Sequence, residues 1–204
     1  MFDVVIHAAL VRILAMDIHT HIPPSSTSGG NTGSGSDTVD VVVYTRSGTW
    51  QGRDKHPGAW TQISSVTVIS QGLGVPTPLP LTAFSPVVVT QDQPVQGFYT
   101  TISNGRYMQY TSSTGLSLTS GDVYTAAAAD LSVLVGAGKN HLFFHTQRDA
   151  IWNGSLYYAV VNSATKDIDN TNASSSSSSR LYPRSTGVAS LVMLVVVAAS
   201  ITML

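Results

Sequence analysis

The chain has 204 residues, a formal net charge of −1 and only 10% charged residues. This composition lacks the basic surface that nucleic acid binding requires. The absence of cysteine excludes disulfides and thiol chemistry. All eleven acidic residues are Asp, whereas Ser, Thr, Val and Gly are abundant, so we expect one all-β domain with few helices.

Apolar residues alternate with a period of two in several short runs, which is typical of half-buried strands. The apolar residues of segment 4–16 suit a pair of strands, and the alternation is clear at Val39, Val41 and Val43. Further strands are predicted at residues 61–70, 87–90, 95–102, 106–112, 131–135 and 156–161. Together they predict an antiparallel β-sandwich or jelly roll over residues 1–165.

Two segments interrupt or follow this pattern. Residues 23–36 are rich in Pro, Ser and Gly and predict a flexible loop between strands, and residues 166–187 include six consecutive serines and predict an extended stalk. Residues 188–204 are apolar and uncharged, and as a helix they would extend about 25 Å. We expect this tail to attach the protein to a membrane at the cell surface.

The tail and the stalk resemble the signal for a glycolipid (GPI) anchor, which combines small residues, a polar spacer and a hydrophobic end. The predicted attachment sites are Ser174, Ser175 and Ser176. A single-pass tail and a buried terminal strand or helix are the alternatives. Because an extracellular domain needs a secretory signal and Asp3, His7 and Arg12 interrupt the first apolar segment, we also expect the protein to begin upstream of Met1.

Several residues are candidates for sites. Asn153 and Asn172 lie in glycosylation sequons, although Asn153 also suits a turn. The spacing of Asp17, His19 and His21 permits a metal site, with a polar strand end as the alternative. Calcium could bind at Asp122 or at residues 167–170, although neither segment has a recognised calcium pattern. The aromatic residues that could stack on sugar rings, or else fill the core, are Trp50, Trp60, Tyr99, Tyr107, Tyr110, Trp152 and Tyr157.

An ordered series of short motifs resembles a β-sandwich repeat of algal cell-surface proteins and bacterial secreted, surface-anchored proteins. It comprises residues 1–4 (MFDV), 17–20 (DIHT), 41–48 (VVVYTRSG), 59–61 (AWT), 74–78 (GVPTP), 97–99 (GFY), 131–138 (LSVLVGAG) and 152–154 (WNG). The resemblance implies an extracellular β-sandwich without established catalytic residues. This chain departs from it at residues 148–151 (RDAI), where the family usually has Pro-Arg, and in its longer 23–36 segment.

The sequence contains no nucleophile elbow, phosphate loop or zinc-protease helix. We therefore expect a non-enzymatic cell-surface display or adhesion module, with carbohydrate as the favoured ligand class. The alternatives are a hydrolase that uses two of Asp54, Asp122 and Asp149, and a purely structural coat domain. Convergence of two of these carboxylates in a cleft would favour the hydrolase.

Overall fold

The computed structural model describes residues 1–20, 38–102, 108–113, 116–127, 130–139, 142–143, 146–161 and 190–196. The helical elements among these residues are two single 3-10 turns, η1 (Pro57–Ala59) and η2 (Leu81–Ala83). The strands are β1 (Phe2–Ile6), β2 (Leu10–His19), β3 (Thr38–Ser47), β4 (Thr61–Ile69), β5 (Pro76–Pro78), β6 (Val87–Thr90), β7 (Val95–Ile102), β8 (Tyr110–Ser112), β9 (Val123–Ala127), β10 (Leu131–Leu134), β11 (Gly136–Lys139), β12 (Thr146–Trp152), β13 (Gly154–Val160) and β14 (Ser190–Val196).

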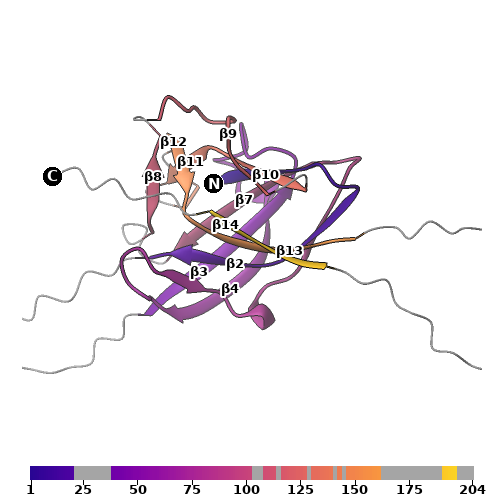
Figure 1. Cartoon of the computed structure of the whole chain (residues 1–204). Coiled ribbons are helices and arrows are strands. Elements are labelled where there is room, and N and C mark those ends of the chain that lie inside the picture. The colour runs from indigo at the N-terminus through magenta and orange to yellow at the C-terminus, as the bar shows by residue number, and fades with distance from the viewer. Residues whose placement is uncertain are drawn as a thin grey trace, which may run out of the picture.

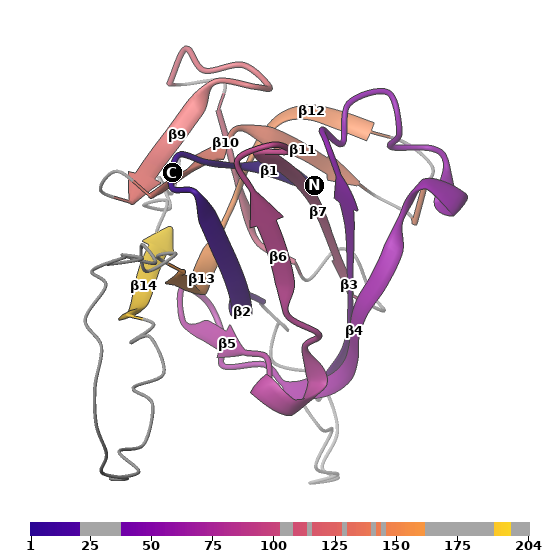
Figure 2. The same ribbon diagram turned by 90° about the vertical axis from the view of Figure 1, so that its right-hand side faces the viewer.

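The strands pair antiparallel in three sheets, which give a β-sandwich-like arrangement (Figure 1). The first sheet has the order β4-β3-β7-β1-β10-β9, and the second has the order β14-β13-β2-β5 with β6 also paired to β2. In Figure 2, β2, β5 and β6 lie on one side, while β3 and β4 form the other. The third sheet, β11-β12-β8, lies beside one end of the larger sheets. The expectation of an all-β domain is confirmed.

The period-two pattern of β3 explains how the core forms. Val39, Val41 and Val43 are at most 2% exposed, whereas Asp40 between them is exposed. The main core lies between the two larger sheets and includes a stack of aromatic rings, in which Phe2 lies 5.5 Å from Phe98 and 4.3 Å from Trp152 between centroids. Burial of these alternating apolar side chains is the main source of stability, since the chain has no disulfide.

The C-terminal tail differs from the expected helix. Ser190–Val196 forms β14, which pairs antiparallel with the whole of β13, from Gly154 opposite Val196 to Val160 opposite Ser190. Residues 188–189 and 197–204 of the tail lie outside the described residues, as do the expected loop at 23–36 and stalk at 166–187. A strand suits this segment because each backbone group facing β13 finds a partner there, so the apolar run extends the second sheet.

Two glycines permit close approach of elements near the end of the fold that holds the third sheet. A Cβ atom on Gly136 would overlap the carbonyl of Met1, and one on Gly154 would overlap the carbonyl of Asp17 and the ring of Trp152. Glycine is the residue without a Cβ, so it is required at both positions. Gly136 of β11 thus lies against the start of β1, and Gly154 of β13 lies against β2 and β12.

Candidate functional site

The structure places the predicted stacking aromatics mainly in the interior. Trp50, Trp60 and Tyr99 are 1%, 8% and 2% exposed and form a second hydrophobic cluster with Met1 and Ala137. Trp152 is also buried, and Tyr107 lies outside the described residues. Trp50 and Trp60 therefore fill a core, which is the alternative that the sequence left open for them.

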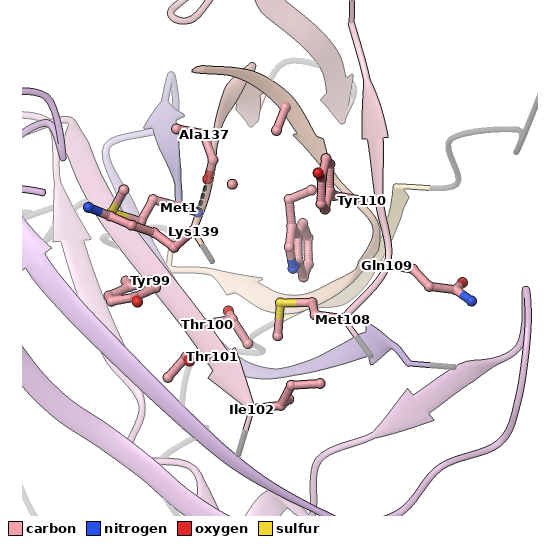
Figure 3. Close-up of a pocket in the computed structure, with 13 residues that line it drawn as sticks. Met1, Tyr99, Thr100, Thr101, Ile102, Met108, Gln109, Tyr110, Ala137 and Lys139 are labelled. Atoms are coloured by element: carbon pink, nitrogen blue, oxygen red, sulfur yellow. Dashed lines mark hydrogen bonds between the residues drawn. The ribbon is translucent and has the colours of Figure 1, made fainter. Parts of the chain in front are cut away.

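Tyr99 and Trp152 also line a small pocket, which lies between the end of β7 and the third sheet (Figure 3). The pocket has a volume of about 50 Å³. At about 10–15 Å³ for each probe-sized water, this is room for a few water molecules or one small polar group. The residues that line it are Met1, Tyr99, Thr100, Thr101, Ile102, Met108, Gln109, Tyr110, Ala137, Gly138, Lys139, Ala150 and Trp152.

Alternation along β12 positions Trp152 in the pocket wall. Ala150 and Trp152 line the pocket, whereas Ile151 between them packs in a separate cluster with Val135. The Trp152 side chain is held by stacking on Phe2, yet its buried indole Nε1 has no hydrogen-bond acceptor among the described residues. A buried N–H group without an acceptor is unfavourable and uncommon, so this nitrogen is a candidate ligand-binding group.

Tyr110 supplies an exposed ring beside the same pocket. Its residue is 44% exposed, and β8 pairs with β12 so that Tyr110 lies opposite Trp152. Gln109 precedes it, but the Gln109 side chain turns away from the pocket in Figure 3, and its Oε1 accepts a hydrogen bond from the Gly74 N–H at 3.4 Å. The pocket therefore combines a buried indole with an exposed phenol ring.

The N-terminus forms part of the opposite wall. The Met1 amine donates a hydrogen bond to the Ala137 carbonyl at 2.6 Å, and the Ala137 N–H donates to the Met1 carbonyl at 2.8 Å (Figure 3). Burial and, to a smaller extent, the charge of Lys139 lower the pKa of this amine to about 5, although Asp3 opposes the shift. The amine is therefore predominantly neutral at pH 7.

Lys139 forms a partly buried ion pair at the edge of the pocket. Its Nζ lies 3.3 Å from Asp54 Oδ2, and Thr146 donates a second hydrogen bond to the same oxygen. Burial lowers the pKa of Lys139 although Asp54 opposes this. Burial alone would raise the pKa of Asp54, but the hydrogen bonds from Thr146 and Lys139 outweigh it and lower that pKa.

The carboxylates proposed for a hydrolase do not line this pocket. Asp54 is bound to Lys139, as described above. Asp149 Oδ1 accepts hydrogen bonds from the backbone N–H and the hydroxyl of Ser120, at 2.7 and 3.0 Å. Asp122 accepts two hydrogen bonds from Thr119, which lower its pKa. Asp122 thus orders a local turn, Asp149 joins β12 to the segment before β9, and Asp54 forms an ion pair.

The predicted metal site is only partly within the described chain. Asp17 Oδ2 accepts a hydrogen bond from the Tyr157 hydroxyl at 2.7 Å, and burial lowers the pKa of His19, whose Nε2 has no partner among the described residues. His21 lies outside them, as do residues 167–170 of the predicted calcium loop. No group of three or more metal-binding side chains occurs within the part that the structure describes.

The predicted modification sites have different positions. Asn153 is 4% exposed, its carbonyl accepts a hydrogen bond from the His19 N–H, and its Oδ1 accepts one from the Thr111 hydroxyl. It therefore occupies the corner between β12 and β13 and is largely buried in the folded domain. Asn172 and the predicted anchor residues Ser174, Ser175 and Ser176 lie outside the described residues.

Sequence reasoning missed most of the pocket. Tyr110 was among the aromatic candidates, but Met108 lies in a predicted strand and nothing in its spacing distinguishes it from other strand residues. The missing acceptor of the Trp152 indole becomes evident only when the strands are assembled.

Within the described residues, the structure has no helix with the length and hydrophobicity needed to cross a membrane. Comparisons of this chain with family models, with curated proteins and with solved structures find no match. The resemblance to surface-anchored β-sandwich repeats therefore remains an expectation from the sequence motifs.

Proposed function

We propose that this chain is a non-enzymatic cell-surface module that binds carbohydrate at the pocket beside Trp152. The observation that supports the proposal best concerns Trp152, which lines the pocket and whose buried indole N–H has no acceptor among the described residues. An indole nitrogen can only donate, so a ligand for this group must supply an acceptor oxygen. Sugar hydroxyl, ring and acetamido oxygens meet this requirement.

The size of the pocket limits how a sugar binds. A volume of about 50 Å³ is too small for a whole pyranose ring but accepts one substituent, such as a hydroxymethyl or acetamido group. The sugar ring then stays outside, where the exposed Tyr110 ring offers a flat apolar face for stacking. Because the Trp152 Nε1 is buried, the proposal requires a small movement of the pocket wall that presents this N–H to the substituent.

The carboxylates favour binding over hydrolysis. Glycoside hydrolysis requires two carboxyl groups that flank the scissile bond. Asp54, Asp122 and Asp149 instead accept hydrogen bonds from neighbouring residues, and none of them lines the pocket. These contacts support a binding module rather than a hydrolase.

Glycan binding tests the proposal, with two matched substitutions to locate the site. Trp152→Phe keeps an aromatic ring against Phe2 but removes the N–H and part of the indole volume, so we expect about ten-fold weaker binding together with a loss of stability from the cavity. Trp60→Phe makes the same change where the N–H donates to the Arg53 carbonyl at 3.0 Å, so it should lower stability and leave binding unchanged. If no glycan binds the unmodified chain, the carbohydrate proposal is wrong and a purely structural coat domain is favoured.

We further propose that the sandwich is displayed outside the cell and is attached to the membrane through its C-terminal segment. The uncharged residues 188–204 after a serine-rich spacer support this proposal. Because Ser190–Val196 pairs with β13, either insertion of the tail or its replacement by a glycolipid near Ser174 requires β14 to leave the sheet. Glycolipid-specific phospholipase should release the native protein, and recovery of a C-terminal peptide that ends in Leu204 from the membrane fraction would refute glycolipid attachment.

A further inference from the structure

The edge of β13 that faces away from β2 forms a complete acceptor site for one further strand. β14 pairs antiparallel with this edge over seven residues, from Gly154 opposite Val196 to Val160 opposite Ser190, without a shift of register. The pairing of β13 with β2 on its other side does contain a shift of register. A regular antiparallel ladder gives the facing backbone N–H and C=O groups their hydrogen-bond partners. The edge therefore takes an extended segment along the whole length of β13.

β14 occupies this site as the last strand of its sheet. The sheet has the order β14-β13-β2-β5, and among the described elements β14 makes its extensive contacts with β13. Figure 2 shows β14 at the outside of the sandwich, beside β13. β13 remains anchored without β14, because it pairs with β2 and its Leu156 and Tyr158 are fully buried in the main core. Departure of β14 therefore breaks one ladder and leaves the acceptor site in place.

The connection between β13 and β14 is far longer than their positions require. Val160 and Ser190 lie directly opposite each other, so a hairpin loop of about two to five residues would join them. The sequence instead places 29 residues, 161–189, between the two strands. When extended, a connection of this length spans up to about 95 Å, which exceeds the diameter of a domain of about 165 residues. β14 can therefore reach the β13 edge of a neighbouring copy.

The long connection also weakens the preference of β14 for its own chain. The effective concentration of a tethered segment falls roughly as the −3/2 power of the linker length. With 29 residues in the connection, β14 is about twenty-fold less concentrated at its own β13 than it would be in a four-residue hairpin. A second copy of β14 then competes for the same edge at a lower protein concentration.

We infer that β14 exchanges between copies of this chain, so that β14 of each copy pairs with β13 of the other. The ladder between two copies is the same as the ladder within one chain, so the contacts are equal and the exchanged fraction rises with protein concentration. Reciprocal exchange fills both acceptor edges and closes the assembly as a two-fold symmetric dimer. A tail that has entered a membrane cannot also pair with β13, so exchange and membrane attachment compete for this segment. The inference does not depend on the pocket beside Trp152.

The chain has no cysteine, so single cysteines can report which copy supplies β14. Ala159 lies opposite Leu191 in the ladder. We expect full-length Ala159→Cys, labelled with nitrogen-15, to form a mixed disulfide with unlabelled full-length Leu191→Cys after the two are incubated together and oxidised. The mass of the product identifies the mixed pair, and its yield should rise with protein concentration. Val123→Cys, on β9 at a residue that is 56% exposed, replaces Ala159→Cys as the control for random collision and should give little mixed product.

The length of the connection provides a second test. Deletion of residues 166–185 from both chains leaves nine of the 29 connecting residues, which still suffice for a turn. The deletion raises the effective concentration of β14 at its own β13 about six-fold. We therefore expect several-fold less mixed disulfide at the same protein concentration, and an unchanged or higher yield would contradict exchange through this connection.

A second cysteine pair and an internal disulfide separate the outcomes. Ser155→Cys with Val195→Cys probes the same ladder, since substitution of the buried Ala159 could disturb the fold. A single chain with both Ala159→Cys and Leu191→Cys shows whether its own β14 occupies the edge. The inference is overturned if this chain closes its internal disulfide while mixed products of both pairs stay at the level of the Val123→Cys control at every concentration. It is also overturned if neither internal nor mixed disulfides form, because β14 would then not occupy the edge of β13.

Discussion

The buried amine of Met1 predicts a specific dependence of stability on pH in a chain that begins at this residue. Burial, followed by repulsion from Lys139, lowers the pKa of the amine from 8.0 to about 5, although Asp3 opposes the shift. The unfolded chain exposes the amine to water and restores its ordinary pKa. Between pH 5 and 8 the unfolded state therefore binds more protons than the folded state, so the free energy of unfolding rises with pH.

The magnitude follows from the two pKa values. The difference between 8.0 and about 5 is about three units, and each unit corresponds to about 1.4 kcal/mol. The amine alone should make the fold up to about 4 kcal/mol less stable at pH 5 than at pH 8. His19 adds an effect of the same sign below its ordinary pKa of 6.5, because burial lowers its pKa.

Urea unfolding at several pH values between 5 and 8 measures this effect. N-terminal acetylation removes the titrating amine but leaves His19 and all carboxylates in place, so the difference between the pH slopes of the free and acetylated chains isolates Met1. We expect the free chain to have the steeper slope. Equal slopes would show that the amine is solvated in the folded state and would refute its burial in the pocket wall.

Three other changes test the fold. Gly154→Ala forces a Cβ against Asp17 and Trp152 and should lower the free energy of unfolding by about 2–3 kcal/mol. Gly58→Ala is the control, because a Cβ at that position meets no atom and should leave the free energy of unfolding unchanged. Equal effects of the two substitutions in urea unfolding would contradict this packing. Asp149 has a φ of 61°, in the left-handed region, and accepts a hydrogen bond from Ser120, so Asp149→Ala should lower the free energy of unfolding by about 2–4 kcal/mol in the same assay. Asp149→Asn should lower it much less, because Asn tolerates this φ and keeps an acceptor for Ser120. A chain that ends at residue 187 lacks β14, so amides of β13 should exchange hydrogen faster; unchanged exchange would show that β14 does not occupy this edge.

The strands that the sequence predicted well have a clear alternation and a buried face. β3 shows a clear alternation, and β7 combines apolar, aromatic and β-branched residues in a short run that is buried on both faces. β5 was not predicted because Pro76 and Pro78 suggested a turn, yet prolines are accepted there since β5 lies at the edge of its sheet. β11 consists of Gly136–Lys139 and has too few side chains to give a pattern.

The tail and the site show where sequence patterns lose information. An apolar run has no period that distinguishes a membrane helix from a strand, and only the edge of β13 shows that Ser190–Val196 has a pairing partner in the fold. Likewise, Trp60 and Trp152 look equivalent in the sequence, but the Trp60 N–H has a backbone acceptor and the Trp152 N–H has none among the described residues. That difference depends on tertiary contacts.

The indole signals of the three tryptophans test the proposed function most directly. In a two-dimensional NMR titration with a bound glycan, the Trp152 indole N–H should shift downfield in a saturable manner as it gains an acceptor, and the Trp60 indole should stay in place because its acceptor is the Arg53 carbonyl. A glycan that binds without moving the Trp152 signal, or a chain that binds no glycan, would contradict the proposal that this pocket is a carbohydrate site.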